Sequence, residues 1–271
     1  MSPIDARNYR DWSVWTQSEG WMKMGADTSI AWTDHTYNPI WGCTRVSDGC
    51  RHCYAAALAR RMGYQVWGPS ATRRVFGDKH WSEPVTWDRS AQRTHTRRRV
   101  FVGSMCDWCD PHPAMTAARP RLWALIRQCS HLDWLLLTKR AERIRDCLPA
   151  DWGEGYANVW LGTSVEHNDY AWRAETLALI PAAVRFVSCE PALGPLDRLR
   201  LDGIDWVIYG GESGPGYRAH DPTWARDLLA RCRQHPDRPA FFFKQSAGRR
   251  PGSGVMLDGQ IIHEYPVPRT P

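Results

Sequence analysis

Three cysteines, Cys43, Cys50 and Cys53, stand close together in the sequence with the spacing C-x6-C-x2-C. Thiolates this near in the chain can converge on one metal centre. A structural zinc site usually takes four protein ligands and leaves no coordination position open. Iron–sulfur clusters are also held by cysteine thiolates, and a [4Fe–4S] cluster with only three of them has one iron free for another ligand. The motif therefore predicts a metal centre whose fourth position has to be explained.

The chain has nine cysteines in all, an odd and clustered set that is typical of metal ligands rather than of a disulfide framework. Cys106 and Cys109 form a second C-x2-C pair. Together with Cys50 and Cys53 they could make a four-thiolate zinc site, which would leave Cys43 unused. Cys106 could instead have a reactive or ligating role near the first three, or it could be a buried structural thiol.

The composition is that of a soluble globular protein with a sizeable core: 271 residues, 43% of them hydrophobic and 24% charged. No apolar run approaches the roughly 18 residues that are needed to span a membrane. The N-terminal residues have no apolar stretch typical of a secretion signal. We therefore expect a cytoplasmic protein that does not contact a membrane.

The formal net charge of +6 is concentrated at Arg97–Arg99 and at Arg249–Arg250. Runs of this kind are most often solvated surface, and otherwise they indicate a polyanionic partner such as nucleic acid. The 16 tryptophans would suit base stacking, although several fall in apolar runs where core packing is the alternative. The charge and the tryptophans therefore favour nucleic acid only weakly.

Short runs that are apolar nearly throughout recur along the chain, and helical patterns separate them. Such runs are typical of strands that are buried on both faces of a parallel sheet. The expected strands are 28–32, 99–103, 133–137, 158–162, 184–188, 205–209 and 240–243, and the expected helices are 54–62, 120–129, 141–148, 170–180 and 223–235. The last helix has an N-terminal signature in Asp221 as cap and Pro222 in the first turn.

Six or seven such units predict an α/β fold, most simply a partial (β/α)6–7 TIM-like barrel, with an open doubly wound sheet as the alternative. The expected barrel covers residues 28–248. The long segment 63–98 is predicted to be an insertion after the first helix, lying over one end of the barrel. Residues 1–27 are expected to form an N-terminal arm, and residues 249–271 a C-terminal tail.

Polar side chains follow nearly every expected strand. In a parallel barrel these strand ends and the loops after them build the active site. Any single one could be a helix cap, but seven sets in register indicate a polar pocket. Two glycines, Gly210 and Gly211, would let backbone approach a ligand, and Glu212 could accept from an ammonium or from ribose hydroxyls. Lys244 follows three phenylalanines, where it invites a partner carboxylate or an anionic ligand.

Several of these stretches together resemble a known family. They are 30–43 with Cys50 and Cys53, then 99–105, 135–140, 160–164, 188–191, 210–214 and 242–245. The chain resembles the radical S-adenosylmethionine (radical SAM) superfamily and, more closely, the phage Gp37/Gp68 family of three-cysteine-motif, DUF5131-like proteins. Two features depart from the superfamily pattern. The first gap in the motif has six residues, where the superfamily usually has about three, and the second strand is followed by Ser104-Met105-Cys106 rather than by a glycine-rich SAM contact.

The superfamily resemblance implies a partial barrel of the radical SAM type in which Cys43, Cys50 and Cys53 ligate a [4Fe–4S] cluster. SAM would bind the open iron, and its reductive cleavage would yield a 5′-deoxyadenosyl radical that takes a hydrogen atom from a substrate. The implied cofactor-binding residues are His52, Tyr54, Ser104, Thr163, Ser164, Glu166, Ser188, Glu190, Gly210, Gly211 and Glu212. The candidate catalytic residues are Cys106, Glu212 and Lys244.

A nucleic acid or nucleotide is the expected substrate, to be modified or repaired, and a flavodoxin- or ferredoxin-like protein is the expected electron donor. Two other functions stay open. The chain could be a zinc-stabilised nucleic-acid-binding protein without catalysis, or it could use an iron–sulfur cluster for structure or redox sensing.

Overall fold

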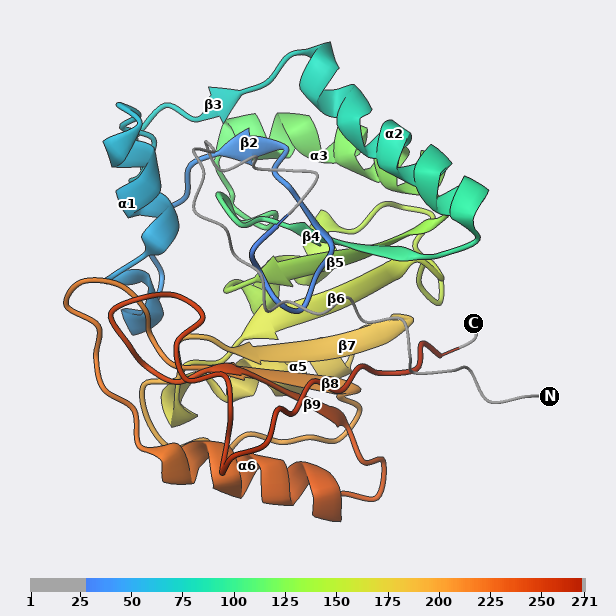
Figure 1. The fold of residues 1–271 in the computed structure, drawn as a ribbon. Coiled ribbons are helices and arrows are strands. Elements are labelled where there is room, and N and C mark those ends of the chain that lie inside the picture. The colour runs from blue at the N-terminus through green and yellow to red at the C-terminus, as the bar shows by residue number, and fades with distance from the viewer. Residues whose placement is uncertain (1–27, 270–271) are drawn as a thin grey trace.

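The structure is a computed structural model, and it describes residues 28–269. Seven parallel strands form one curled sheet, β1-β4-β5-β6-β7-β8-β9, in which the spatial order follows the chain order (Figure 1). A doubly wound sheet reverses its order at a switch point, and this sheet does not. The prediction of a partial (β/α) barrel is therefore confirmed. The strands are β1 His35–Tyr37, β4 Arg98–Val102, β5 Leu132–Thr138, β6 Val159–Ser164, β7 Val184–Cys189, β8 Trp206–Gly210 and β9 Ala240–Gln245.

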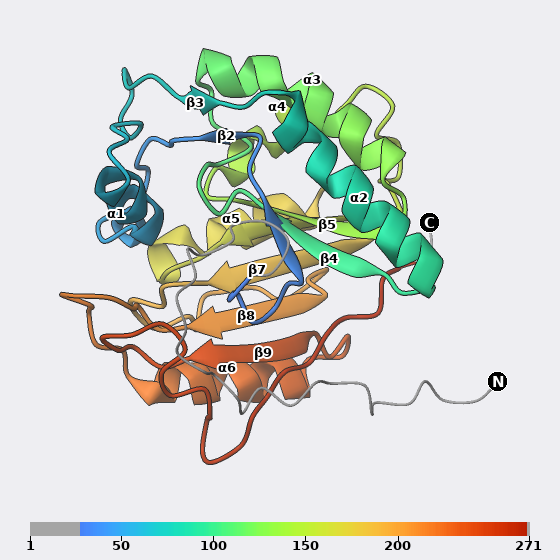
Figure 2. The same ribbon diagram turned by 45° about the horizontal axis from the view of Figure 1, so that its top comes forward.

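Helices α2, α3 and α6 cover the outer face of the curled sheet, and α1 stands beside the ends to which the strand arrows point (Figures 1 and 2). The α-helices are α1 Tyr54–Arg61, α2 Asp78–Thr94, α3 Pro113–Gln128, α4 Ile144–Cys147, α5 Trp172–Ala178 and α6 Pro222–Gln234. Short 3-10 helices are η1 Asp48–Cys50, η2 Ala141–Arg143 and η3 Asn168–Tyr170, and β2 Ile40–Trp41 pairs with β3 Arg74–Val75. Within residues 28–269, no helix is long and apolar enough to cross a bilayer.

The strands bury both of their faces, as their apolar runs predict. In β4, Phe101 points into the inner cluster of the half-barrel, while its neighbours Val100 and Val102 belong to the outer cluster beneath the helices. The inner cluster is rich in aromatic rings, among them Trp206 and Phe242. Successive side chains of a strand point to opposite faces, and both faces are buried here. Polar side chains are therefore excluded from the middle of the strands and collect at their ends.

The expected first strand at 28–32 is wrong. Residues 31 and 32 form a turn, and the first strand is β1, three residues further on. Trp32 lies 2% exposed inside the half-barrel, with its ring centroid 4.6 Å from that of Phe101. The run is apolar because its side chains fill the concave face of the half-barrel, although its backbone does not form a strand of the sheet. An apolar run of four or five residues does not distinguish these two uses.

The segment 63–98 contains a helix that the sequence analysis did not identify. Helix α2 has 17 residues and contains Pro84 in its interior. Proline is rare inside helices, so the sequence does not indicate a helix at this position. Trp81 and Trp87 bury themselves in the outer cluster, and α2 packs against α3, β4 and β5. It therefore serves as the covering helix between β1 and β4. The predicted N-terminal arm, 1–27, lies outside the described residues.

The C-terminal segment after residue 249 adds to the inner side of the barrel. Phe243 donates its backbone N–H to Ile262, and Phe242 forms an antiparallel bridge with His263. Tyr265 then packs on Trp206 with a centroid separation of 5.4 Å. The segment thus protects the edge of β9, which would otherwise expose unpaired backbone groups.

The arginine run at 97–99 sits at the start of β4, at the opposite end of the strand from its polar exit. Arg97 pairs with Asp133 at 2.7 Å, and Arg99 pairs with Asp34 at 3.2 Å. These arginines are therefore used to join neighbouring strands. Ten tryptophans are buried in the described part of the chain, so the tryptophan count reflects core packing rather than a stacking surface.

Gly162 in β6 provides a test of the inner packing. A Cβ on Gly162 would collide with the ring of its register partner Phe186, which is fully buried. We predict that Gly162→Ala lowers the free energy of unfolding by about 1–3 kcal/mol, as overpacking of a core does. Urea denaturation followed by tryptophan fluorescence measures it. Gly248→Ala is the matched control, because a Cβ there makes only an ordinary 3.4 Å contact with the Ser253 side chain, and it should stay within about 0.5 kcal/mol of the wild type.

Candidate functional site

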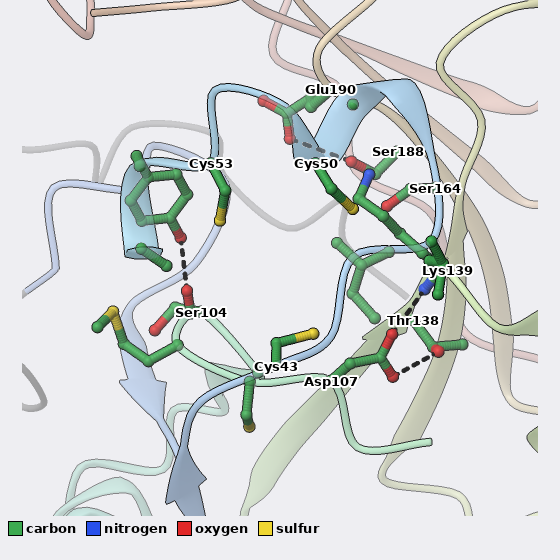
Figure 3. A pocket seen from close by; sticks show the side chains of 18 of the residues that line it. Cys43, Cys50, Cys53, Ser104, Asp107, Thr138, Lys139, Ser164, Ser188 and Glu190 are labelled. Carbon is green, nitrogen blue, oxygen red and sulfur yellow. Dashed lines mark hydrogen bonds between the residues drawn. The ribbon is translucent and has the colours of Figure 1, made fainter. Parts of the chain in front are cut away.

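A pocket of about 180 Å³ opens at the carboxyl ends of the strands, between the sheet and the loop that carries the cysteine motif (Figure 3). Its apolar floor consists of Ile30, Trp32, Phe101 and Leu137. Ten of the site residues expected from the sequence line it: Cys43, Cys50, Cys53, Tyr54, Ser104, Cys106, Ser164, Ser188, Glu190 and Lys244. The expected pocket is therefore present, and it gathers residues from most of the strand ends.

The three motif cysteines point into this pocket from one loop, residues 43–53 (Figure 3). Gly42 has a φ of 117°, a conformation that favours glycine, and it turns the chain from β2 into the loop. Cys50 ends the 3-10 helix η1, and Cys53 caps α1. All nine cysteines of the chain are free thiols, so none of the three motif cysteines is consumed in a disulfide.

The positions of the three thiols can be compared with what a metal ion or a cluster requires of its ligands. Within residues 28–269, no three Cys, His, Asp or Glu side chains stand close enough together to chelate one metal ion. A four-iron cluster is larger than one ion, and its thiol ligands surround it rather than meet at a point. The three thiols surround a shared space in this way (Figure 3). Cys43, Cys50 and Cys53 are thus the residues that would hold such a cluster.

A buried ionic network supports the first cysteine. Arg140 donates to Asp107 at 2.8 Å and to the backbone oxygen of Thr44 at 2.8 Å, and it lies 3.9 Å from Cys43 Sγ. Burial and the charge of Asp107 raise the pKa of Cys43 to about 12, although Arg140 opposes the shift. In the metal-free protein this thiol is protonated. Arg140 lies in the stretch 135–140 that carries the family resemblance, and it was not among the expected site residues.

An ion pair also lines the pocket. Lys244 Nζ donates to Glu190 at 2.7 Å, and the other oxygen of Glu190 accepts from Trp32 Nε1 at 3.2 Å and from Ser188 at 3.3 Å. Gly210 makes room for this carboxylate, since a Cβ there would approach Glu190 to 2.8 Å. Glu190 is therefore held by several partners, and it fixes the ammonium group of Lys244 in the pocket lining. Gly210 supports the pocket without lining it.

The remaining expected residues lie outside the pocket lining. Thr163 is buried and donates to the backbone of Thr138. Glu166 is buried in ion pairs, and Gly211 lies against the backbone of Ala247. His52 and Glu212 contact each other at 3.0 Å above the cysteine loop. The sequence offered only two signals for these residues: an ionisable side chain and a position at a strand end. Neither signal distinguishes a residue that lines the pocket from one that is buried in an ion pair behind it.

The alternative of a four-thiolate zinc site does not fit the structure, because its four cysteines do not lie together. Cys109 is completely buried in the outer cluster, to which Cys147 also belongs. Cys106 does line the pocket, and burial raises its pKa well above the usual value. The chain turns between the two cysteines of this C-x2-C pair, so Cys106 faces the pocket and Cys109 faces the core.

The protein is thus an α/β half-barrel in which three free thiols line a pocket at the carboxyl ends of the strands. Comparison with known proteins then identifies the family. A profile described as "Protein of unknown function (DUF5131)" matches residues 27–266, nearly the whole chain, and the protein belongs to this family. The DUF5131-like resemblance is thereby confirmed.

No curated protein matches the sequence. Among solved structures, a mutant spore photoproduct lyase with bound AdoMet and dinucleoside spore photoproduct is similar, with a TM-score of 0.47 and 12% sequence identity. The similarity covers 79% of this chain and 65% of the lyase chain, so this chain spans slightly less than two thirds of that protein.

The contacts of Glu212 predict a pH dependence of stability. Burial acts to raise its pKa, but hydrogen bonds from Arg218 and His52 outweigh burial and lower the pKa to about 2, from an unfolded value of 4.5. A lowered pKa stabilises the folded protein above pH 4.5, and this contribution disappears as the pH falls toward 2. Arg218 also donates to the backbone oxygen of Asp48, so Glu212 ties the β8 loop to the cysteine loop.

We predict that Glu212→Gln costs about 1–3 kcal/mol of unfolding free energy at pH 7, as the loss of a buried charged hydrogen bond does. Its difference from the wild type should shrink as the pH is lowered from 5 to 3. Urea denaturation across that range measures both effects. The exposed Glu154→Gln should follow the wild type at every pH, and a pH-independent loss in Glu212→Gln would contradict the assignment.

Proposed function

We propose that the protein is an iron–sulfur enzyme of the radical SAM type, in which Cys43, Cys50 and Cys53 hold a [4Fe–4S] cluster and SAM binds in the adjoining pocket. One observation carries the proposal. Three free thiols from one loop line a single pocket at the carboxyl ends of a parallel half-barrel, where such folds place their chemistry. The resemblance of the sequence to the superfamily supports the identity of the two cofactors.

When bound and reduced, the cofactors would supply a 5′-deoxyadenosyl radical for hydrogen abstraction. The residues of the chain would provide position and shelter. The apolar floor, with Trp32 and Phe101, excludes water from the space beneath the thiols. Lys244, oriented by Glu190, has ammonium hydrogens left to bind an anionic group of a ligand. Cys106 would be the candidate catalytic thiol of the pocket, and it stays protonated because burial raises its pKa.

For the substrate we propose a nucleic acid or nucleotide. Support comes from arginines on the strand-end loops that are exposed and make no ion pair within the described residues: Arg45, Arg51, Arg249 and Arg250. Arg45 and Arg51 flank η1 beside the pocket, and the other two follow β9. Unpaired cations around a mouth attract polyanions, in contrast to the paired arginines at the start of β4.

We further propose a cytoplasmic location, because nine free thiols suit a reducing compartment. An electron for the cluster would come from a flavodoxin- or ferredoxin-like protein there.

Replacing a ligand tests the central proposal. We predict that anaerobically purified wild type is brown, contains about four irons per chain and forms 5′-deoxyadenosine from SAM on reduction. Alanine at Cys43, Cys50 or Cys53 should abolish 5′-deoxyadenosine formation, because each removes a ligand. Iron analysis, absorbance before and after dithionite, and chromatography of the nucleoside measure these properties.

Cys129→Ala is the matched control, since Cys129 is buried in the outer cluster, and it should keep iron and cleavage. Colourless wild type with one zinc per chain would contradict the proposal in favour of a zinc-stabilised binding protein. A reducible cluster without cleavage of SAM would instead favour a structural or redox-sensing role.

The exposed arginines predict how binding depends on salt. The double variant Arg249→Ala/Arg250→Ala should bind a single-stranded oligonucleotide more weakly, and the slope of log affinity against log salt should fall by about 1.4, at about 0.7 for each lost phosphate contact. Fluorescence anisotropy at several salt concentrations measures the slope. Arg89→Ala/Arg93→Ala on α2 removes the same charge from another surface, and an equal effect there would contradict a nucleic-acid site at the mouth.

A further inference from the structure

Glu166 follows β6 and is completely buried, yet it contacts three separate elements through its side chain. One carboxylate oxygen accepts from Ser47 in the cysteine loop at 2.5 Å and from Lys139, after β5, at 2.6 Å. The other oxygen accepts from Arg173 in α5 at 2.9 Å. The exposed fraction of the Glu166 side chain is 0% and that of Arg173 is 3%. The carboxylate is therefore saturated by its own chain and has no exposed atom to offer a ligand.

The contact with the cysteine loop involves shape as well as charge. Gly49 packs so closely that a Cβ there would approach Glu166 Oε1 to 2.5 Å. Ser47 and Gly49 both lie in the six-residue gap between Cys43 and Cys50. The residues that lengthen this gap are thus the ones that dock the loop onto Glu166.

Ser47 also connects Glu166 to a cysteine. Its hydroxyl lies 3.7 Å from Cys50 Sγ. Burial opposes ionisation of Glu166, but Lys139 and Arg173 outweigh it and lower the pKa, so the carboxylate can only accept. The single hydroxyl proton of Ser47 goes to Glu166, so the residue that bonds Glu166 also contacts Cys50. Cys50 is 8% exposed in this arrangement.

We infer that Glu166 is a positioning residue, which holds residues 47–50 through Ser47 and Gly49 so that Cys50 is already directed into the pocket before any metal binds. The expectation that Glu166 contacts SAM is thereby replaced by a role behind the cysteine loop. That Cys50 is positioned as a cluster ligand rests on the proposed function, whereas the docking of the loop does not.

Thiol labelling of the reduced, metal-free protein tests the docking. Modification by N-ethylmaleimide, followed by mass spectrometry, gives a rate for each cysteine. We expect Ser47→Ala to raise the labelling rate of Cys50 by about tenfold, as for the loss of a hydrogen bond to a charged group. Gly49→Ala should raise it too, because its Cβ would collide with Glu166 and displace the loop. Glu166→Gln should raise it as well, and Ser47→Thr, which keeps the hydroxyl, should restore a rate near that of the wild type.

Two buried cysteines away from the loop, Cys129 and Cys232, report general unfolding, and their rates should not change. Ser82→Ala, on α2, is the control for serine replacement and should label like the wild type. The inference is overturned if Cys50 labels at the wild-type rate in both Ser47→Ala and Gly49→Ala. It is also overturned if Cys129 and Cys232 accelerate together with Cys50.

Reconstitution with iron and sulfide separates this inference from the proposed function. If the loop is docked, Ser47→Ala should take up iron more slowly than both wild type and Ser47→Thr. Selective acceleration of Cys50 labelling, combined with a wild type that takes up no iron, would uphold the docking by Glu166 and overturn the proposed function.

Discussion

Buried carboxylates that are paired with cations hold the cysteine loop against the strand ends, and the arrangement of the pocket depends on them. Burying an isolated charge is costly, and removing one partner of a buried pair typically destabilises a protein by about 3–5 kcal/mol. Glu166 pairs with Lys139 and Arg173, and Asp107 pairs with Arg140. Each carboxylate has its partners fixed in neighbouring elements, so the loop has one well-defined position.

The curled sheet is what brings those partners together. Because the helices cover one face and aromatic rings with Trp32 fill the other, ionisable groups are tolerated only where strands end. Seven parallel strands in chain order bring these ends to one side of the molecule (Figure 1). This geometry brings chemically different side chains into one pocket. Thiols, the Glu190–Lys244 pair and apolar side chains line the pocket together.

Much of the fold could be predicted because the strands carry their own signal. Six of the seven expected strands were found within one or two residues, and Asp221 caps α6 as expected, with its side chain accepting from Thr223. The run ending at Trp32 and the helix α2 could not be predicted. An apolar run has the same composition whether it lies in a sheet or plugs a barrel, and Pro84 hides a helix that tertiary packing stabilises.

For the site, the residue types at each strand end, including the three cysteines, could be predicted from the sequence, because chain order and spatial order coincide in a parallel barrel. The role of each side chain became apparent from the folded structure alone. Lys244 and Glu190 line the pocket, Glu166 lies behind the loop, and Cys109 faces the core. The physical reason is that a side chain's role depends on burial and on its partners. Those partners come from elements far away in the chain, which local spacing does not encode.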